Sequence, residues 1–393
     1  MNESHGNRAK AAENAKAIMK TLLPAAICVL SVTVTYYYKL DIVQWLLLTF
    51  AVAGALAYSV YAKIMRHKTA GAVTVFYISM SVVFLFYLYP ASYIAQSGTV
   101  LNNNWFEALN WINANTPECS TVATYWDPGH FIRAIGNRTV VFDGGSQNHL
   151  FQLMANESRA DGLAVENYDN GISHIVEYKN GIRTTGRIQD ISTTLMTSNE
   201  SLALNILKDY RKPGCKDIYY IASADLMGKS VWWTYFATWA PNKKGTCNGG
   251  GITDPKGDCY SYNVLQLSGA SPNGNSIIYT YNAGNNQAFL LNYDTQQDRM
   301  QAFISQNNNL FKVKETFFFQ KDGSGVIYTA PDAEVSGMAW VDGSRNLIIY
   351  MPPQIQDSVF TKLMLFNGAG LKNFELVNDW GSEVKLYKVK IDE

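Results

Sequence analysis

Three long apolar segments near the start of the chain constrain its architecture more than any other feature. They span Thr21–Tyr37, Ile42–Ala62 and Ala70–Ile94, and none contains an internal Asp, Glu, Lys or Arg. A helix of roughly 20 residues crosses about 30 Å of hydrocarbon, so each segment is long enough to cross a bilayer. Three such segments in series, behind a polar leader, do not form a cleaved signal peptide. We therefore predict three transmembrane helices within residues 1–96.

The charges around these segments predict their orientation. Lys and Arg gather before the first segment and between the second and third, whereas the loop between the first and second carries only Lys39 and Asp41. Positive residues concentrate on the cytoplasmic side of a membrane. We therefore expect a multi-pass protein of the cell membrane with a cytoplasmic N-terminus. After three crossings, the residues beyond about 96 are expected to be extracytoplasmic.

The overall composition excludes two broad classes of protein. Hydrophobic residues make up 47% and aromatic residues 13% of the 393 residues, which is enough to build buried cores and argues against a largely disordered chain. The net charge is zero, and the sequence has neither a basic stripe nor paired Cys/His zinc spacings. We therefore expect no nucleic-acid partner.

Four of the five cysteines fall in the part expected outside the cytoplasm: Cys119, Cys215, Cys247 and Cys259. Four cysteines permit two disulfides in three connectivities. Cys247 and Cys259 flank a glycine-rich polar loop, and a cross-link would restrict a segment of this kind. This pair is therefore the candidate disulfide.

Beyond residue 96, the hydrophobic pattern first alternates between helix and strand and then becomes strand-rich. The alternation predicts an extracytoplasmic α/β domain over residues 97–268, and the later pattern predicts a small β-rich C-terminal domain over residues 269–393. The expected class is thus an α+β membrane protein with three N-terminal transmembrane helices. The expected helices cover 105–115, 130–135, 146–159, 201–210 and 225–239. The expected strands cover 121–126, 139–143, 217–223, 276–281, 288–293, 313–319, 325–329, 346–351, 374–377 and 384–391.

The stretch most suggestive of a site is Thr124-Tyr125-Trp126-Asp127-Pro128-Gly129-His130. At the end of a strand, Trp126 would offer an indole N–H donor and Asp127 a carboxylate acceptor, a pair suited to holding a hydroxyl group. In the alternative interpretation, Asp127 caps a helix that begins near His130 and the aromatic residues belong to the core. The spacing alone favours this second interpretation.

The motif, with three further stretches, resembles the catalytic subunit of archaeal oligosaccharyltransferase, whose signature is Trp-Trp-Asp-x-Gly. The further stretches are the helix ending in Asn115-Thr116-Pro117, the block Asn137–Asn148, and Ala224–Lys229 followed by aromatic residues. The C-terminal stretch Leu363–Val389 is also similar, so the resemblance covers most of residues 97–393. Tyr125 stands in place of the first Trp of the signature, and Pro128 stands at a position often held by Tyr.

The resemblance implies protein N-glycosylation: the transfer of a lipid-linked, dolichol-type oligosaccharide to the Asn of an Asn-x-Ser/Thr acceptor polypeptide. It implies that Tyr125, Trp126 and Asp127 hold the hydroxyl of the acceptor's Ser or Thr, and that Gly129 permits a turn. Asp225, Met227 and Lys229 match a second short motif of the family, which lies beside that pocket. From the spacing alone, Asp225 and Lys229 are equally an ordinary helical pair.

The catalytic half of such an enzyme is not recognisable in this sequence. The family binds a divalent cation (Mn or Mg) through carboxylates that include an Asp-x-Asp motif, which is absent here. The first 96 residues offer only Glu3, Glu13 and Asp41. No catalytic residue is therefore identified in this chain. We expect the metal ligands on a missing N-terminal part or on a polytopic partner subunit.

Two other functions are compatible with parts of the sequence. A non-catalytic, membrane-anchored surface protein could bind sequon peptides or glycans through the same residues. A metallohydrolase could use Asp127, His130, Asp143 and His149, because His and carboxylate side chains within two turns of each other can bind zinc. Binding of Asn-x-Thr peptides without a membrane partner would favour the surface protein, and stoichiometric zinc the hydrolase.

Overall fold

A computed structural model describes residues 101–146, 163–179, 182–247, 256–284, 287–307 and 309–391. The three predicted membrane segments and most of the predicted helix 146–159 lie outside these ranges. In the ranges that the structure describes, we find no helix that combines the length and the apolar character needed to cross a membrane.

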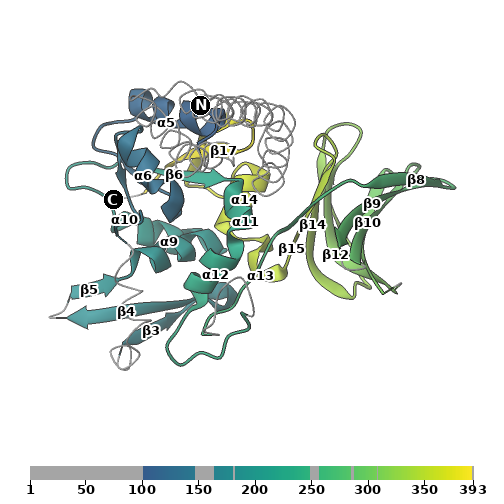
Figure 1. Ribbon diagram of the computed structural model, residues 1–393, viewed down its shortest axis with the longest axis horizontal. Coiled ribbons are helices and arrows are strands. Elements are labelled where there is room, and N and C mark those ends of the chain that lie inside the picture. The colour runs from purple at the N-terminus through teal and green to yellow at the C-terminus, as the bar shows by residue number, and fades with distance from the viewer. Residues whose placement is uncertain are drawn as a thin grey trace, which may run out of the picture. The chain divides into compact units, whose positions relative to one another are not determined.

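A five-stranded mixed sheet, in the order β16-β17-β6-β1-β2, carries the elements around the site. Figure 1 labels two of its strands, β6 and β17. Strand β1 is parallel to both β2 and β6, whereas β17 is antiparallel to β6 and β16. Strands β16 and β17 come from the range 269–393, which was predicted as a separate β-rich domain. The strands of that range are therefore divided between two sheets. The strands are β1 (Thr121–Ala123), β2 (Thr139–Val140), β6 (Ile218–Ser223), β16 (Phe374–Trp380) and β17 (Val384–Val389).

Helices cover both faces of this sheet. Every residue of β6 is buried, and alternate side chains enter different clusters: Tyr220 joins the cluster that contains α9, α12 and α14, whereas Ile221 joins the cluster of α5. A strand buried on both faces reads as a continuous apolar run, as β6 does. The helices are α5 (Asn103–Asn115), α6 (Trp126–Ala134), α9 (Arg187–Met196), α10 (Glu200–Lys208), α11 (Asp225–Gly228), α12 (Ser230–Thr238), α13 (Pro353–Gln356) and α14 (Val359–Phe366), with a short 3₁₀ turn, η2, at Asp169–Gly171.

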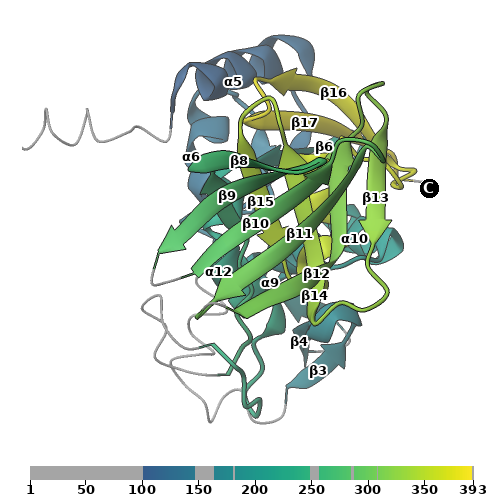
Figure 2. The ribbon, with the colours of Figure 1, turned by 90° about the vertical axis from the view of Figure 1, so that its right-hand side faces the viewer.

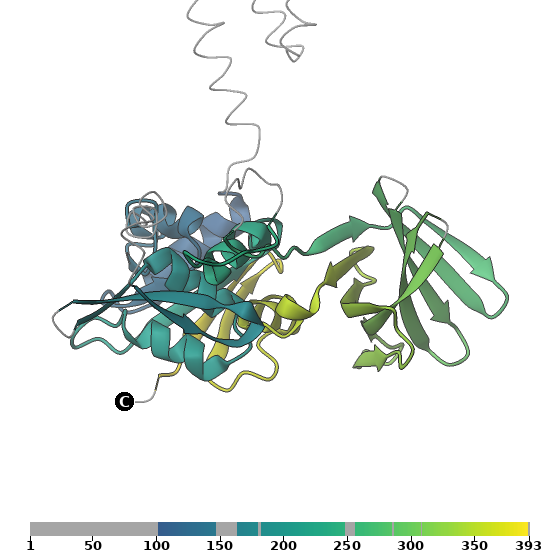
Figure 3. The ribbon, with the colours of Figure 1, turned by 90° about the horizontal axis from the view of Figure 1, so that it is seen from below.

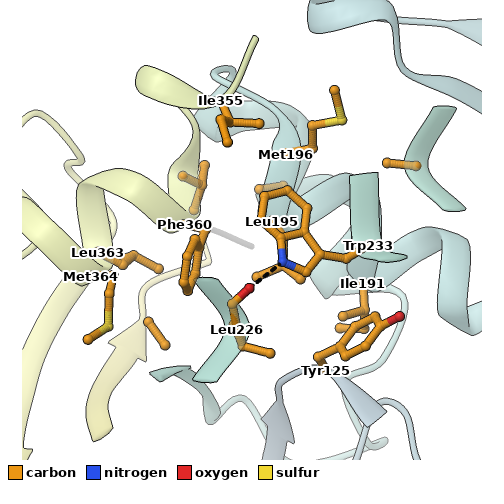
Figure 4. Close-up of a cluster of buried hydrophobic side chains, with 14 of the residues drawn as sticks. Tyr125, Ile191, Leu195, Met196, Leu226, Trp233, Ile355, Phe360, Leu363 and Met364 are labelled. Carbon is orange, nitrogen blue, oxygen red and sulfur yellow. Dashed lines mark hydrogen bonds between the residues drawn. The ribbon is translucent and has the colours of Figure 1, made fainter. Parts of the chain in front are cut away.

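Trp233 lies at the centre of the larger cluster (Figure 4). Its side chain is fully buried, its ring packs edge-on against Phe360 at 5.7 Å, and its Nε1 donates to the Leu226 carbonyl oxygen at 2.9 Å. Burying an indole with its N–H satisfied stabilises the fold without the cost of an unpaired donor. The contact ties α12 to α11 and α14.

A second, nine-stranded sheet has the order β7-β15-β14-β12-β11-β10-β9-β8, with β13 also paired to β12 (Figures 2 and 3). It is antiparallel except where β12 pairs with β14. Its own cluster includes Phe289, Phe318 and Ile348. The strands are β7 (Asn263–Gln266), β8 (Gly269–Asn273), β9 (Ser276–Gly284), β10 (Gln287–Asp294), β11 (Arg299–Gln306), β12 (Asn309–Phe319), β13 (Gly325–Thr329), β14 (Val335–Asp342) and β15 (Leu347–Met351).

A small antiparallel sheet lies against α9 and α12. Its strands are β3 (Ala164–Asn167), β4 (Ser173–Lys179) and β5 (Ile182–Thr185). Strand β5 pairs with β4 only from Val176 onward, so the start of β4 has no strand neighbour on that side among the described residues. There, the buried Gln189 side chain of α9 accepts from the Ile175 backbone N–H at 2.8 Å and donates to the Ser173 carbonyl at 2.7 Å. Neither this sheet nor α9 is predicted by the sequence patterns.

Several predicted elements are confirmed, and others need correction. Helix α5 and strands β6 and β13 closely match their predicted ranges. The predicted strand 121–126 is wrong at its end, because β1 stops at Ala123 and α6 begins at Trp126. The predicted helix 225–239 is broken at Lys229, where ψ is 6° and the chain passes from α11 to α12. These two corrections concern residues of the candidate site. The predicted strand 139–143 is also too long, because β2 ends at Val140, and strands β7, β8, β11 and β14 were not predicted.

Two disulfides fix the segments around the five-stranded sheet. Cys119 pairs with Cys215, which joins the residues just before β1 to those just before β6. Cys247 pairs with Cys259, the pair expected from the loop between them. The Asp258 backbone N–H beside this bridge donates to the Thr238 hydroxyl of α12 at 2.7 Å. The residues beside Cys259 are therefore held against the helix that lines the site.

Candidate functional site

A cavity of about 350 Å³ lies beside the ends of β1 and β6. These two strands are parallel neighbours, and helices α6 and α11 follow directly after them. Ligands of open α/β sheets bind outside the carboxyl ends of the strands, which is the position of this cavity. The lining residues are Tyr125, Trp126, Asp127, Ile188, Lys229, Trp232 and Phe236.

The start of α6 places Trp126 and Asp127 at the cavity. Tyr125 is the N-cap residue, so Trp126 and Asp127 are the first two helical residues and Pro128 is the third. Proline is tolerated in the first turn because its missing N–H has no intrahelical partner there, and a carboxylate is favoured there by the helix dipole. The motif therefore forms a helix start, whereas the sequence suggested a loop before a helix near His130.

Two glycines allow α6 to approach the segment after β2. A Cβ on Gly129 would lie 2.5 Å from the Phe142 carbonyl oxygen, and one on Gly144 would lie 2.7 Å from the His130 side chain. Gly129 is thus inside a helix at a close contact, which corrects the expectation that it permits a turn. Its missing side chain keeps the helix that carries Asp127 close to the sheet.

Lys229 joins the two predicted motifs. Its Nζ forms an ion pair with the Asp127 carboxylate, and it donates to Asp225 Oδ2 at 2.8 Å. Burial lowers the pKa of Lys229, but the hydrogen bonds to the two carboxylates outweigh it, and the net effect raises the pKa above 10.5. Asp225 and Lys229 are therefore a helical pair, as their spacing allowed, and Lys229 also reaches across to α6.

Apolar side chains close the other sides of the cavity. Tyr125 is 2% exposed, and its ring meets Phe142 edge-on at 6.1 Å. Burial, with a smaller contribution from Asp127, raises the pKa of the Tyr125 phenol well above its usual range, so the phenol stays neutral. Trp232 is 39% exposed and stacks on Phe236 with centroids 6.4 Å apart. The cavity thus combines one ion-paired carboxylate with aromatic and aliphatic walls.

Some site residues lie elsewhere than the sequence suggested, and others were missed. Met227 is buried in the core and is not among the cavity's lining residues. Of the two neighbouring indoles, Trp232 lines the cavity and Trp233 lies in the core. Ile188 was missed because no sequence motif marks α9. Phe236, four residues after Trp232, could have been found from helical spacing.

The acidic side chains at this cavity do not fit a divalent cation. Asp127 and Asp225 both pair with the ammonium group of Lys229, so a positive charge already lies where a metal would need to bind. No cluster of three or more His, Cys, Asp or Glu side chains suited to a metal occurs among the described residues. For the zinc hypothesis, Asp143 instead pairs with Arg133 at 2.9 Å. His149 lies outside the ranges that the structure describes.

The chemistry available at the cavity is binding. A carboxylate can accept a hydrogen bond from a hydroxyl, an indole N–H can donate one, and the apolar walls can hold a methyl or methylene group. No Ser, Cys or Lys of the lining set is paired with a His general base, because the set contains no His. These contacts are of the kind that a small hydroxyl-bearing group makes.

Comparison with curated proteins finds archaeal relatives that share one name. The chain is 28% identical over 341 residues to a dolichyl-phosphooligosaccharide-protein glycotransferase of Methanocaldococcus jannaschii, covering 73% of this chain and 34% of that protein. It is 26% identical over 333 residues to a protein of the same name from Methanococcus voltae, covering 70% and 35%. The chain thus spans about a third of the length of the curated relatives it matches.

The chain was also compared with solved structures and with models of protein families. The C-terminal domain of C. jejuni PglB matches 73% of this chain and all of its own, with a TM-score of 0.41 and 15% identity. The C-terminal globular domain of an oligosaccharyltransferase from Archaeoglobus fulgidus matches 74% of this chain and all of its own, with a TM-score of 0.30 and 10% identity. No family model matches the chain.

Proposed function

Because the chain is a relative of the archaeal oligosaccharyltransferases, we propose that it supplies the acceptor-binding part of such an enzyme. In this proposal, the cavity beside α6 binds the Ser or Thr side chain of an Asn-x-Ser/Thr acceptor polypeptide. The observation that carries the proposal is the convergence of Trp126, Asp127 and Lys229 at one cavity, from segments about 100 residues apart in the sequence.

The hydroxyl of the acceptor would donate a hydrogen bond to the Asp127 carboxylate. Lys229 forms an ion pair with that carboxylate and fixes its position, so one of its oxygens can accept without reorganisation of the site. Trp126 would cover the hydroxyl and exclude water from it. A site built to hydrogen-bond a hydroxyl discriminates strongly against a ligand without one, because its own polar groups are then left unpaired.

The transfer itself would join a lipid-linked oligosaccharide to the Asn side chain of the bound acceptor. The family's divalent cation has no fitting ligand set among the described residues, since the two carboxylates here are paired with Lys229. We therefore assign the metal-dependent part of the reaction to carboxylates outside the described residues or on a polytopic partner. The three apolar segments would hold the cavity at the outer face of the cell membrane, where both substrates would meet.

Peptide binding to the purified full-length chain in detergent tests the proposal. An acetylated, amidated Asn-Ala-Thr peptide is compared with Asn-Ala-Val, because Val has the shape of Thr but lacks the hydroxyl. We expect the Thr peptide to bind at least about tenfold more tightly, the range for a hydrogen bond to a charged group. Asp127→Ala should remove this preference.

A matched control separates the site from a general charge effect. Asp332 also pairs with a lysine, Lys312, but on the nine-stranded sheet. Asp332→Ala should leave the preference for the Thr peptide unchanged. Equal binding of the Thr and Val peptides by the unaltered chain would contradict the proposal.

A further inference from the structure

A second cavity, of about 730 Å³, lies between the nine-stranded sheet and the C-terminal segments. It is about twice the volume of the cavity beside α6, and part of its lining, from Met364 to Lys385, falls in the C-terminal stretch Leu363–Val389 noted above. Its walls come from β11, β12, β14, the turn after β14, the end of α14 and the β16–β17 hairpin. Six of its lining residues carry the argument: Phe318, Phe319, Trp340, Asp342, Arg345 and Lys385.

Arg345 offers unused hydrogen-bond donors to this cavity. Its Nε donates to Asp342 Oδ2 at 2.5 Å, which fixes the guanidinium group, whereas its two terminal nitrogens make no hydrogen bond to any residue that the structure describes. Asp342 Oδ1 is itself occupied by the backbone N–H and hydroxyl of Ser344. The free edge of the guanidinium group has the geometry that binds a carboxylate with two parallel hydrogen bonds.

A second positive charge, already paired within the protein, and one donor left unpaired among the described residues also lie at this cavity. Lys385 is 4% exposed, and its Nζ donates to the Met364 carbonyl at 2.8 Å and to Asn367 Oδ1 at 2.5 Å, with the carboxylate of Asp379 at 3.7 Å. The Trp340 Nε1 is buried and has no hydrogen-bond partner among the described residues. A buried donor without a partner is costly, and a ligand oxygen would remove that cost.

The exposed aromatic ring at this cavity favours a flat, partly apolar ligand. Phe319 is 53% exposed, next to Phe318, which is fully buried. The C–H face of a pyranose ring can cover such a ring and remove its apolar surface from water. A volume of 730 Å³ lies within the range of small-molecule sites and has room for more than one sugar ring.

The strand pairing leaves no long open edge for an extended peptide among the described strands of the walls. Strand β17 is paired on both sides along its length, whereas β11 is paired on one side only before Phe303, and the pairing of β12 with β14 stops at Phe317 and Trp340. A peptide that adds to a sheet needs a continuous unpaired strand edge, and these strands offer only short ones. The combination of a guanidinium donor pair, a buried indole N–H and an exposed aromatic face is instead suited to a carboxylate-bearing sugar.

We propose that this cavity binds an acidic saccharide, with the carboxylate on Arg345 and a sugar ring on Phe319. The inference rests on the proposed function in one respect: an oligosaccharide-transferring enzyme meets a saccharide on its donor and on its product. The cavity would then hold part of the glycan away from the acceptor site. It would select glycans that contain a uronic acid.

Binding of trigalacturonate to the purified full-length chain tests this inference. The control ligand is the methyl ester of trigalacturonate, which keeps the three pyranose rings but lacks the charges. We expect the acid to bind about tenfold more tightly than the ester, as removal of a charge-assisted hydrogen bond predicts. Arg345→Gln should abolish that difference, and Phe319→Ala should weaken both ligands by roughly fivefold.

Control variants and a second ligand complete the test. Leu310→Ala and Lys314→Gln alter exposed side chains of the same strand, β12, outside the cavity, and should leave binding unchanged. Unfolding midpoints verify that the variants fold. No binding of trigalacturonate at millimolar concentration, equal binding of its ester, or equally tight binding of an acetylated tri-glutamate peptide would overturn the inference.

The peptide assay described above distinguishes the two proposals when it is run on the same preparation. If the Asn-Ala-Thr peptide binds with its hydroxyl preference and trigalacturonate does not bind, only the saccharide site fails. If trigalacturonate binds as expected and the peptide preference is absent, only the acceptor site fails.

Discussion

The five-stranded and nine-stranded sheets differ in how completely they are covered. Every residue of β6, at the centre of the first sheet, is buried, whereas every residue of β8, at the edge of the second, is exposed. In the first sheet, helices cover β6 from both faces, and the cavity beside α6 lies at the ends of the parallel strands β1 and β6. Precise positioning of polar groups thus occurs where packing is most complete.

The largest expected effect on stability is the loss of a side chain between the helices that cover the first sheet. Trp233→Ala removes a fully buried indole and leaves the Leu226 carbonyl without its donor. We expect a loss of about 3–5 kcal/mol in the free energy of unfolding. Denaturant unfolding of the purified chain measures this loss.

Its counterpart on the second sheet is Ile327→Ala, which truncates a side chain that is 50% exposed on β13. A change there is expected to alter stability by about 0.5 kcal/mol or less. Similar losses for the two variants would show that the two sheets are not covered differently in solution.

The two disulfides provide the next test, because both belong to the part around the first sheet. Cys119 and Cys215 are 96 residues apart, and Cys247 and Cys259 are 12 residues apart. A longer closed loop restricts the unfolded chain more, so replacing the first pair by Ser should cost about 2–4 kcal/mol and exceed the cost of replacing the second. Unfolding midpoints of the two double variants measure the order, and the reverse order would refute the argument.

A smaller loss is expected from Gly129→Ala, about 1–3 kcal/mol, because the new Cβ would collide with the Phe142 backbone. The shift of α6 should also weaken the preference for the Asn-Ala-Thr peptide, since Asp127 is carried by the same helix. Gly269→Ala on β8 meets no atom within 4 Å and should leave both stability and binding nearly unchanged. Equal effects at the two glycines would remove the evidence that close packing positions the site.

Gly129 also shows where prediction from sequence reached its limit. The Trp126-Asp127 pair was predicted as a site, but its backbone was predicted as a strand end, because Val122 and the aromatic residues continue a strand-like pattern. The structure ends β1 at Ala123, and Pro128 in the first turn fits a helix that starts at Trp126. Local patterns identified the residue types but not the element that carries them.

A local strand pattern can be predicted from sequence, whereas a tertiary contact between distant residues cannot. Strand β13 of the second sheet and the Lys229–Asp127 contact beside the first sheet illustrate the difference. Strand β13 alternates between exposed and partly buried residues, and its range was predicted without error. The contact of Lys229 with Asp127 joins residues 102 positions apart and depends on the parallel pairing of β1 and β6. Ile188 was not predicted as a lining residue of the cavity, because no local sequence pattern indicates which helix packs beside a strand end.

The smallest expected effects are changes in stability with pH, and they differ in sign between the two cavities. At the first, burial lowers the pKa of Lys229, but hydrogen bonds to Asp127 and Asp225 raise it above 10.5 overall. The stabilisation from Lys229 is therefore complete below about pH 10.5 and is lost as the pH rises through its pKa in the folded protein. Because these side chains are partly exposed, we expect about 1 kcal/mol or less.

At the second cavity, burial raises the pKa of Asp342, but hydrogen bonds from Ser344 and Arg345 lower it below 3.8 overall. The stabilisation from Asp342 is therefore complete well above pH 3.8 and is lost as the pH falls through its pKa in the folded protein. We expect the stability difference between the unaltered chain and Lys229→Met to shrink at alkaline pH. The corresponding difference for Asp342→Asn should shrink at acid pH. Unfolding free energies measured between about pH 3 and pH 11 separate the two, and a Lys229→Met difference that stays constant through the alkaline range would show that Lys229 is not held by the two carboxylates.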